Sequence, residues 1–322
     1  MFLGVDGGGT KTAFALVSSE GDVLARHQTT SAYYLEVGFD GVAEMIRRGV
    51  LDTLALAGLS QDDVRYAFFG LPSYGEDSAL QAQFDEIPRS VFPHQRYRCG
   101  NDMVCSWAGS LACFDGISVV AGTGSIAYGQ YAGRSARCGG WGELFSDEGS
   151  AYWIAREGLN LFSRMSDGRI GKGLLHAIVR ERLNLSSDLD LCAAVYAQTD
   201  RSRFAQFSKL VRDAAEAGDL QAQDIFFRAA QELAAIVNAL RSNLGVAKDT
   251  LLPVSYSGGV FSNGSLVLAP FQSALTQRSA GLVLTPPRFP PVIGAALFAA
   301  KLCSQHLDAA ALQMLDMQTK VD

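Results

Sequence analysis

The chain has no long uninterrupted hydrophobic run, because Gly, Arg or Asp breaks each of its longest apolar stretches. None approaches the roughly 18 apolar residues of a membrane-spanning helix, so no membrane partner is expected. Positive charge is also scarce: 27 Lys and Arg stand against 33 Asp and Glu, which gives a formal net charge of −6. This balance argues against nucleic-acid binding and against an anionic membrane surface. An anionic ligand must therefore be held by local donors.

The cysteines form no recognisable ligand pattern. There is no C-x-x-C pair and no Cys/His spacing typical of a zinc site. We expect reduced thiols, most of them buried, in a cytoplasmic protein. Strand-like residues begin at Phe2 without a basic segment before them, so no secretory signal is expected. The six cysteines are Cys99, Cys105, Cys113, Cys138, Cys192 and Cys303.

Three common catalytic motifs are missing or incomplete. The sequence has neither a G-x-x-x-x-G-K-[ST] phosphate loop nor a G-x-S-x-G nucleophile elbow. Residues Gly122–Ala127 fit G-x-G-x-x-A, and Glu143 follows at about the distance of the ribose carboxylate in a dinucleotide fold. A helix should then follow the glycines, but Ile126–Tyr131 alternates like a strand. We therefore reject dinucleotide binding.

The stretch that is present in full is the first one, Phe2–Val17. An apolar run ends at Asp6, three glycines follow, and Thr10–Thr12 leads into a second apolar run. Glycines let backbone N–H groups approach an anion, and hydroxyl and lysine donors suit phosphate oxygens. A carboxylate at the tip of the first strand suits Mg²⁺. We interpret the stretch as a phosphate-binding hairpin; the alternative is an ordinary glycine-rich turn.

The same strand–turn–strand pattern recurs at Ile117–Tyr131, about 115 residues further along, which predicts two similar lobes. Strands alternate with helices elsewhere, so the predicted fold class is α/β. The first helix is expected over 41–57, with Asp40 as its N-cap. Further helices are expected over about 101–112, 150–162 and 223–243 and, as the last element, from near Pro291.

These glycine turns, with a third at Gly258-Gly259 after a strand, resemble the phosphate and adenosine motifs of the sugar kinase/Hsp70/actin superfamily. Three stretches are similar to the N-acetylglucosamine kinase and BadF/BadG/BcrA/BcrD ATPase family in particular. They are Gly4–Thr12, Gly139–Trp153 and Ala217–Asp219, and the similarity runs nearly end to end. The string from Gly139 to Ser150 is the most specific of them.

The resemblance implies two RNase-H-like (actin-like ATPase) lobes with the active site in the cleft between them. The N-terminal lobe would comprise residues 1–113 and a C-terminal helix at about 290–322, and the C-terminal lobe residues 114–289. It also implies ATP and Mg²⁺ as cofactors, a homodimer, and transfer of the γ-phosphate to a hydroxyl of an amino sugar. N-acetylglucosamine, giving N-acetylglucosamine 6-phosphate, is the substrate expected first.

The resemblance also assigns roles to residues. Asp6 would serve Mg²⁺ directly or through water, and Asp102 would be the catalytic base. The nucleotide would be bound by Gly8, Gly9, Thr10, Lys11, Thr12, Gly122, Thr123, Gly124, Ala217, Gly258 and Gly259. The sugar would be bound by Ser73, Asp102, Gly140, Trp141 and Asp147. From the residues alone, Asp102 and Asp147 are also interpretable as helix caps and Trp141 as a core residue.

Three positions depart from the family pattern. Ala32 and Ile126 stand where Asn is frequent, and Ser146 stands where Gly is usual. The first two changes remove polar groups that would contact the sugar, so glucosamine or another hexose remains an alternative substrate. An activator-type ATPase with a shared iron–sulfur cluster and a sugar-responsive regulator are the alternative functions.

Overall fold

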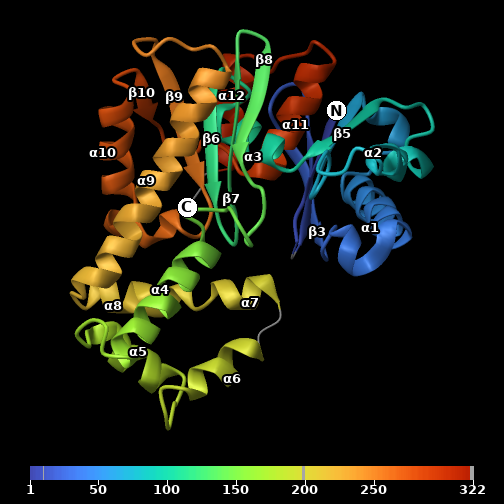
Figure 1. Ribbon diagram of the computed structural model, residues 1–322. Coiled ribbons are helices and arrows are strands. Elements are labelled where there is room, and N and C mark those ends of the chain that lie inside the picture. Colours follow the sequence, from blue (N-terminus) through green and yellow to red (C-terminus); the bar gives the residue numbers. More distant parts are fainter. Residues whose placement is uncertain (10, 198–199, 320–322) are drawn as a thin grey trace. The chain divides into compact units, whose positions relative to one another are not determined.

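The computed structural model describes residues 1–9, 11–197 and 200–319, and the chain in it divides into two units. Unit 1 comprises Met1–Ser118 and Pro286–Asp322, and unit 2 comprises Val119–Thr285. Each unit contains one five-stranded sheet with helices, so the predicted α/β class is confirmed (Figure 1). Among the described residues, no helix is both long and apolar enough to cross a bilayer.

The sheet of unit 1 has the strand order β3-β2-β1-β4-β5. The first three strands along the chain pair antiparallel through short turns, whereas β1, β4 and β5 pair parallel. Parallel pairing requires a crossover, which helix α1 (Tyr34–Leu56) supplies between β3 and β4. The strands are β1 (Phe2–Gly7), β2 (Thr12–Val17), β3 (Val23–Thr29), β4 (Tyr66–Leu71) and β5 (Tyr97–Asn101).

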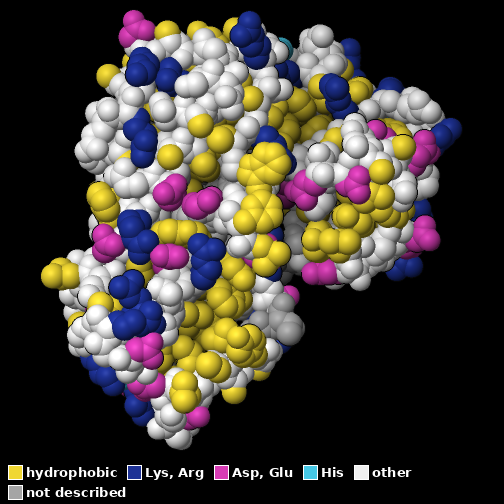
Figure 2. Space-filling view, in the orientation of Figure 1, with side chains coloured by type: hydrophobic (Ala, Val, Ile, Leu, Met, Phe, Trp, Pro, Cys, Tyr) yellow, Lys and Arg dark blue, Asp and Glu magenta, His cyan; other side chains and the backbone are white. Residues whose placement is uncertain are grey.

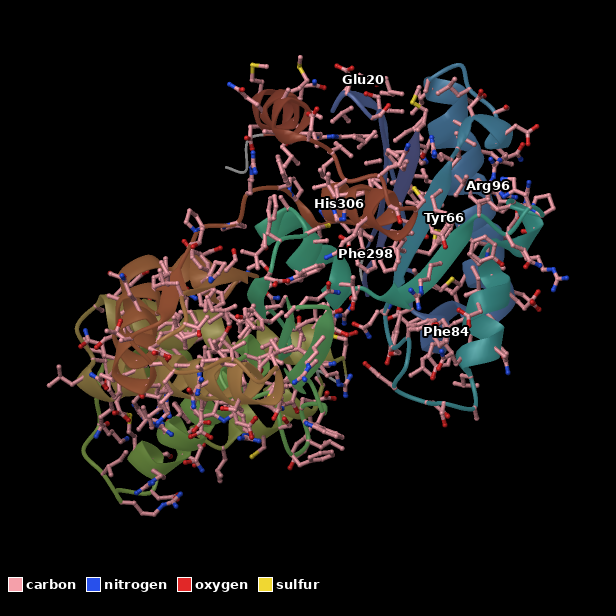
Figure 3. All side chains as sticks on the ribbon, turned by 90° about the horizontal axis from the view of Figure 1, so that it is seen from above. Glu20, Tyr66, Phe84, Arg96, Phe298 and His306 are labelled. Carbon is pink, nitrogen blue, oxygen red and sulfur yellow. The ribbon has the colours of Figure 1, made fainter. Side chains whose placement is uncertain are left out.

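Neighbouring phenylalanines of β4 serve the two faces of this sheet. Phe68 packs edge-on against Phe298, with ring centroids 4.8 Å apart, and Phe69 packs on the other face against Phe92 at 6.1 Å. Figure 3 shows Phe298 on α11 (Pro291–Leu302) and Phe84 on α2 (Gln81–Glu86) on opposite sides of the strands. The last segment of the chain therefore completes the core around its first strand.

The sheet of unit 2 has the order β10-β9-β6-β7-β8. Read from its other edge, this is the order of the first sheet, with β6, β7 and β8 standing where β1, β2 and β3 stand. The prediction of two similar lobes is thus confirmed. The strands are β6 (Gly116–Ala121), β7 (Ser125–Tyr131), β8 (Arg134–Gly139), β9 (Leu252–Ser257) and β10 (Leu282–Leu284).

A largely helical segment lies between β8 and β9. Hydrophobic side chains gather on the part of it that carries α5 to α7 (Figure 2), where Leu189 is 79% and Tyr196 is 82% exposed. Its helices are α4 (Ala151–Ser166), α5 (Leu174–Arg182), α6 (Asp190–Tyr196), α7 (Arg201–Ala205), α8 (Ser208–Glu216) and α9 (Leu220–Asn243). The remaining elements are α3 (Met103–Leu111), α10 (Leu268–Arg278), α12 (Ala309–Gln318), η1 (Gln61–Asp63), η2 (Ile87–Ser90) and η3 (Phe261–Leu266).

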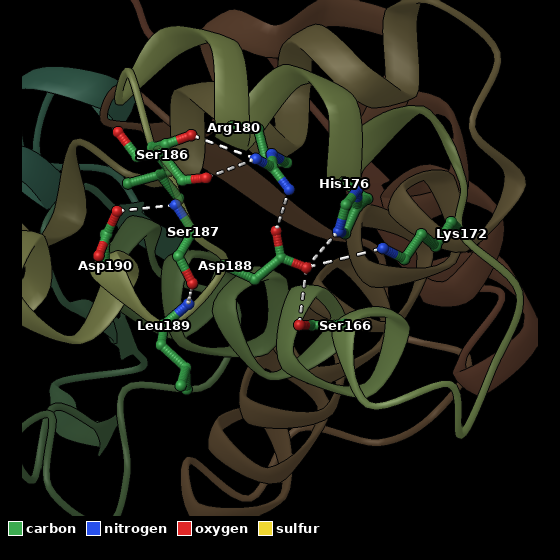
Figure 4. A network of polar contacts seen from close by, with 10 residues as sticks. Ser166, Lys172, His176, Arg180, Ser186, Ser187, Asp188, Leu189 and Asp190 are labelled. Carbon is green, nitrogen blue, oxygen red and sulfur yellow. Dashed lines mark hydrogen bonds and ion pairs between the residues drawn. The ribbon is translucent and has the colours of Figure 1, made fainter.

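The carboxylate of Asp188 is the centre of a cluster of polar side chains in the α4–α6 region (Figure 4). Asp188 accepts hydrogen bonds from Ser166 Oγ at 2.8 Å and from the Arg180 guanidinium at 2.7 Å. The His176 Nε2 atom lies 2.9 Å from the same carboxylate, and its ring stacks on Phe162 at 5.0 Å. These contacts lower the pKa of Asp188 to about 2. The hydrogen bond with His176 has the largest effect, and the hydrogen bond with Ser166 comes next. The cluster ties three segments of the helical region together.

Three expectations are wrong in detail. Helix α1 begins at Tyr34 rather than near Gly41, and Asp40 lies inside it rather than at its cap. The helix tolerates this start because Gly38, with φ of 72°, joins two helical pieces across a kink. The chain ends in two helices, α11 and α12, instead of one. All six cysteines are free, but half of them, rather than most, are buried.

Candidate active site

The first glycine turn joins β1 to β2 as the expected hairpin. The Gly8 N–H donates to the Lys11 carbonyl at 3.0 Å, and the Ala32 N–H donates to the Gly8 carbonyl at 3.2 Å. Lys11 is exposed, and a Cβ added to Gly9 would meet no atom within 4 Å. The turn therefore leaves room for a ligand against its backbone. Thr10 lies outside the described residues.

Thr12 begins β2 with a fully buried side chain. Its Oγ1 atom has no hydrogen-bond partner among the described residues. A buried hydroxyl without a partner costs free energy, so such atoms mark places where a further group belongs. The orphaned hydroxyl beside the glycine turn fits the binding of a nucleotide and its metal ion there.

Two half-buried carboxylates, Asp6 and Asp102, lie where the parallel strands β1 and β5 end. Asp6 pairs with Gly70 of β4, and a Cβ added to Gly70 would lie 3.2 Å from the Cα of Asp102. Burial, and after it the charge of Asp102, raise the pKa of Asp6 to about 7. Burial also raises the pKa of Asp102 to about 6. A carboxylate pair of this kind suits a divalent cation and a proton acceptor.

Asp102 occupies the N-cap position of α3, but its side chain accepts no capping hydrogen bond. The neighbouring Asn101 takes that role, since its Oδ1 accepts from the Met103 N–H at 3.1 Å. Asn101 Nδ2 also donates to the Tyr74 carbonyl at 3.1 Å, in the loop that holds Ser73. Asp102 therefore stands at the cap position without making the capping hydrogen bond there.

Ser73 follows β4 with φ of 63°, in the left-handed region that a non-glycine residue seldom adopts. The Ser73 carbonyl accepts from the Glu76 N–H at 3.1 Å, which closes the turn. Cys105, which sequence reasoning did not place in the site, lies beside Asp6 and Gly70. Its Sγ donates to the Val5 carbonyl at 3.7 Å, and its hydrogen bond with Asp6 lowers the pKa of that carboxyl.

In unit 2, the turn Gly122–Gly124 joins β6 to β7. Its carbonyls receive the first N–H groups around the start of α4: Ala151 donates to Gly122 at 2.8 Å and Tyr152 to Thr123 at 3.3 Å. The strand that follows confirms the rejection of a dinucleotide motif. Backbone hydrogen bonds thus join the turn to the start of α4.

The third glycine turn lies against this one. Gly258 has φ of 98°, and a Cβ on it would lie 2.9 Å from the Gly122 nitrogen. The Val260 N–H donates to the Ala121 carbonyl at 2.9 Å. Only glycine at position 258 fits this close approach, so the third glycine turn lies against Gly122. Ala217 lies at the exposed end of α8, just before Asp219, which caps α9.

The loop from β8 to α4 carries the predicted sugar residues of unit 2. Trp141 is 67% exposed, with the Arg137 guanidinium 5.5 Å from its ring centroid, so its interpretation as a core residue is wrong. Gly140 has φ of 70°, and a Cβ on it would lie 2.6 Å from Cδ1 of Ile126. Ile126 therefore presents an apolar side chain to this loop.

Asp147 ends the same loop, only 2% exposed and with φ of 57°. Its Oδ1 accepts from the Gly142 N–H at 3.4 Å, and its Oδ2 accepts from the Arg201 guanidinium. Burial raises the pKa of Asp147, and the charge of Arg201 opposes that rise. The side chain that caps α4 is that of Ser150, which accepts from the Trp153 N–H at 3.1 Å. Asp147 is therefore not the helix cap.

Sequence reasoning missed Arg201 altogether. It begins α7, which lies 54 residues beyond Asp147 along the chain, and no motif surrounds it. Only the fold of the helical segment places it beside the loop.

The chain is similar to known proteins over most of its length. The model of the BadF/BadG/BcrA/BcrD ATPase family matches residues 3–299. The N-acetyl-D-glucosamine kinase of Dictyostelium discoideum is 28% identical over 311 residues, covering 93% of this chain and 97% of that protein. The N-acetylmuramic acid/N-acetylglucosamine kinase of Clostridium acetobutylicum is 27% identical, covering 94% and 98%.

A solved structure supports the fold. A provisionally assigned N-acetylglucosamine kinase of Chromobacterium violaceum superposes with a TM-score of 0.72 at 25% identity, covering 92% of this chain and 98% of that one. The family match extends over most of the chain and includes each predicted site residue. The chain belongs to the BadF/BadG/BcrA/BcrD ATPase family.

Proposed function

We propose that the chain is an ATP-dependent kinase that phosphorylates N-acetylglucosamine on its 6-hydroxyl. The observation that carries the proposal is the half-buried carboxylate of Asp102, which makes no capping hydrogen bond at the start of α3 and lies near a second carboxylate, that of Asp6 at the end of β1. Two relatives, which this chain matches over nearly their whole length, act on N-acetylglucosamine according to their names.

The nucleotide would be held by backbone rather than by a strongly basic surface. The turns at Gly8–Lys11 and Gly122–Gly124 offer N–H groups to phosphate oxygens, and Lys11 adds a positive charge. Gly258, Gly259 and Ala217 are assigned to the adenosine side. Asp6, directly or through water, would hold Mg²⁺, which when bound neutralises charge on the phosphates.

Phosphoryl transfer requires mainly positioning and charge stabilisation, together with a group that accepts the alcohol proton. Asp102 supplies that acceptor: with a pKa raised to about 6, it is ionised at neutral pH and still basic enough to take a proton. The proton moves from the sugar hydroxyl to the Asp102 carboxylate as the hydroxyl oxygen attacks the γ-phosphorus, and the bond from that phosphorus to the β-phosphate oxygen breaks and releases ADP.

The sugar would be bound by Ser73, Gly140, Trp141 and Asp147. Asp147 is suited to accept hydrogen bonds from sugar hydroxyls because an ionised carboxylate offers about four acceptor sites. The exposed ring of Trp141 offers an apolar wall for a pyranose face. Ala32 and Ile126 leave glucosamine or another hexose as the alternative acceptor. Action as a homodimer in the cytoplasm belongs to the same proposal.

The test is ADP release from Mg-ATP with and without a panel of sugars: N-acetylglucosamine, glucosamine, N-acetylmannosamine and glucose. We expect strong stimulation by N-acetylglucosamine, with the 6-phosphate as product. Stimulation by another sugar would correct the substrate and keep the kinase. Slow hydrolysis that no sugar changes would overturn the proposal in favour of an activator-type ATPase, for which iron content is the next measurement.

A further inference from the structure

Arg201 joins two carboxylates of the β8–α4 loop to the helical segment. Its guanidinium bonds Asp147 Oδ2, and its Nε lies 3.1 Å from Glu143 Oε2. Planar guanidinium groups bind carboxylates in fixed directions, so one side chain sets the orientation of both acids. Arg201 therefore ties the helical segment to the loop that carries the predicted sugar residues.

The same contact lies against the second glycine turn. A Cβ on Gly124 would lie 2.6 Å from Asp147 Oδ2 and would also overlap the guanidinium of Arg201. The carboxylate and its arginine are thus packed directly on the backbone of the turn assigned to phosphate. A shift of Arg201 would move the sugar-binding carboxylate relative to that turn.

Asp147 depends on its partner because so little of it reaches water. It is 2% exposed, and an ionised carboxylate in such a place is costly unless it is paired and hydrogen-bonded. The Gly142 N–H and Arg201 provide those contacts. With the backbone hydrogen bond from Ser125, they use three of the roughly four acceptor sites on the carboxylate, which leaves one for a sugar hydroxyl.

We propose that Arg201 is a positioning residue for the sugar. Its guanidinium keeps the Asp147 carboxylate ionised and orients it so that it accepts a hydrogen bond from a sugar hydroxyl. This inference rests on the proposed function and extends it to a residue outside the three stretches that carry the family resemblance. Arg201 is not assigned to ATP binding, although it lies beside the turn Gly122–Gly124.

The test compares Arg201→Gln and Arg201→Lys with wild type for KM of N-acetylglucosamine, KM of ATP and kcat. For Arg201→Gln we expect the sugar KM to rise about 10–100-fold, the loss typical of a charged hydrogen bond, with the ATP KM within about threefold. Arg201→Lys keeps the charge and should recover part of the sugar KM. A rise in the ATP KM equal to that in the sugar KM, or an unchanged sugar KM, would overturn the inference.

Arg228→Gln is the matched control. Arg228 is 45% exposed against 43% for Arg201, and it also pairs with two carboxylates, those of Glu157 and Asp224. It lies on α9 and touches none of the predicted sugar residues that the structure describes. Its variant should leave both KM values within about twofold of wild type.

The pH profile provides a readout that lost stability does not move. Among the described residues, the charged groups that face Asp147 are Arg201 from α7 and Glu143 from its own loop. Arg201 lowers the pKa of Asp147, so its removal should shift the acid limb of kcat/KM for sugar to higher pH. If the wild type is stimulated by sugar but the acid limb of kcat/KM is not shifted in Arg201→Gln, this inference is overturned and the proposed function stands. A wild type that no sugar stimulates defeats the proposed function, and this inference with it.

Discussion

Gly294 of α11 and Gly109 of α3 are packed backbone to backbone. A Cβ placed on Gly294 would lie 2.6 Å from the Cα of Gly109 and would overlap its amide nitrogen. On the other side, a Cβ on Gly109 would lie 2.7 Å from the carbonyl oxygens of Phe289 and Pro290. The two helices that cover one face of the first sheet approach each other this closely because neither has a side chain at the contact.

Gly294→Ala should therefore destabilise unit 1. The added methyl group meets backbone atoms, which cannot move aside as a flexible side chain can, so we expect a loss of about 2–4 kcal/mol in the free energy of unfolding. Urea unfolding followed by circular dichroism measures it. Gly171→Ala is the control, because a Cβ there meets nothing within 4 Å. Equal unfolding midpoints for the two variants would contradict the packing argument.

Asp102→Asn should fold normally and bind sugar, but lose about 10²–10⁴-fold in kcat, the usual effect of removing a general base. The side chain accepts no capping bond, so α3 loses little when the charge is removed. Steady-state ADP release gives kcat, and thermal unfolding checks the fold. Asp77→Asn, at an exposed turn, is the control for loss of an acidic side chain. Turnover within tenfold of wild type would exclude Asp102 as the base.

Asp188→Asn should lower the stability of unit 2 by about 1–3 kcal/mol, because it removes charged hydrogen bonds from a partly buried cluster. Asp167→Asn breaks an exposed ion pair with Arg169 and should cost less than about 0.5 kcal/mol. Chemical unfolding of both variants measures the difference. The same loss in both would show that the cluster is only a surface feature.

The stability that Asp188 provides should depend on pH in a defined direction. Its pKa is depressed to about 2 in the folded protein, against about 3.9 in an unfolded chain. Its contribution is therefore complete above about pH 4 and is lost as the pH falls toward 2. The stability difference between wild type and Asp188→Asn should shrink over that window. A constant difference from pH 6 to pH 3 would contradict this assignment.

Trp141 should report sugar binding by fluorescence. It is 67% exposed, whereas Trp107 and Trp153 are buried, so a sugar placed on its ring shields the one tryptophan that faces water. N-acetylglucosamine should shift the emission to shorter wavelength, and Trp141→Phe should abolish the shift while keeping the emission of the other two. A shift that persists in Trp141→Phe would place the ring outside the sugar site.

The sequence was sufficient for the strands and the glycine turns because their signals are local. Short apolar runs on either side of a glycine-rich turn predicted both hairpins, and the repeat of that pattern predicted the second sheet. The kink at Gly38 was not predictable, since a glycine inside a helical pattern does not show that a helix precedes it. The number of final helices was also missed, because α11 and α12 are separated by only a short loop.

The candidate site was predictable as far as its motifs extend. The resemblance indicated Asp6, Asp102 and Asp147 by their positions in recognisable strings. It could not indicate Arg201 or Cys105, whose importance comes from contacts made by distant parts of the chain. Whether Asp102 caps a helix also depends on which of two adjacent side chains, Asn101 or Asp102, takes the N–H of Met103, and sequence does not decide that.

Unit 1 is built from two segments at opposite ends of the chain, and this affects how it folds during synthesis on the ribosome. Strand β1 is made first, yet α11, which packs on it, is made almost last. Residues Val119–Thr285 form a continuous unit and are complete before that helix leaves the exit tunnel. The emerging chain must therefore keep an unfinished hydrophobic surface on its first sheet while the second half of the protein folds. Chaperone demand should be greatest over that interval and should end when the C-terminal helices arrive.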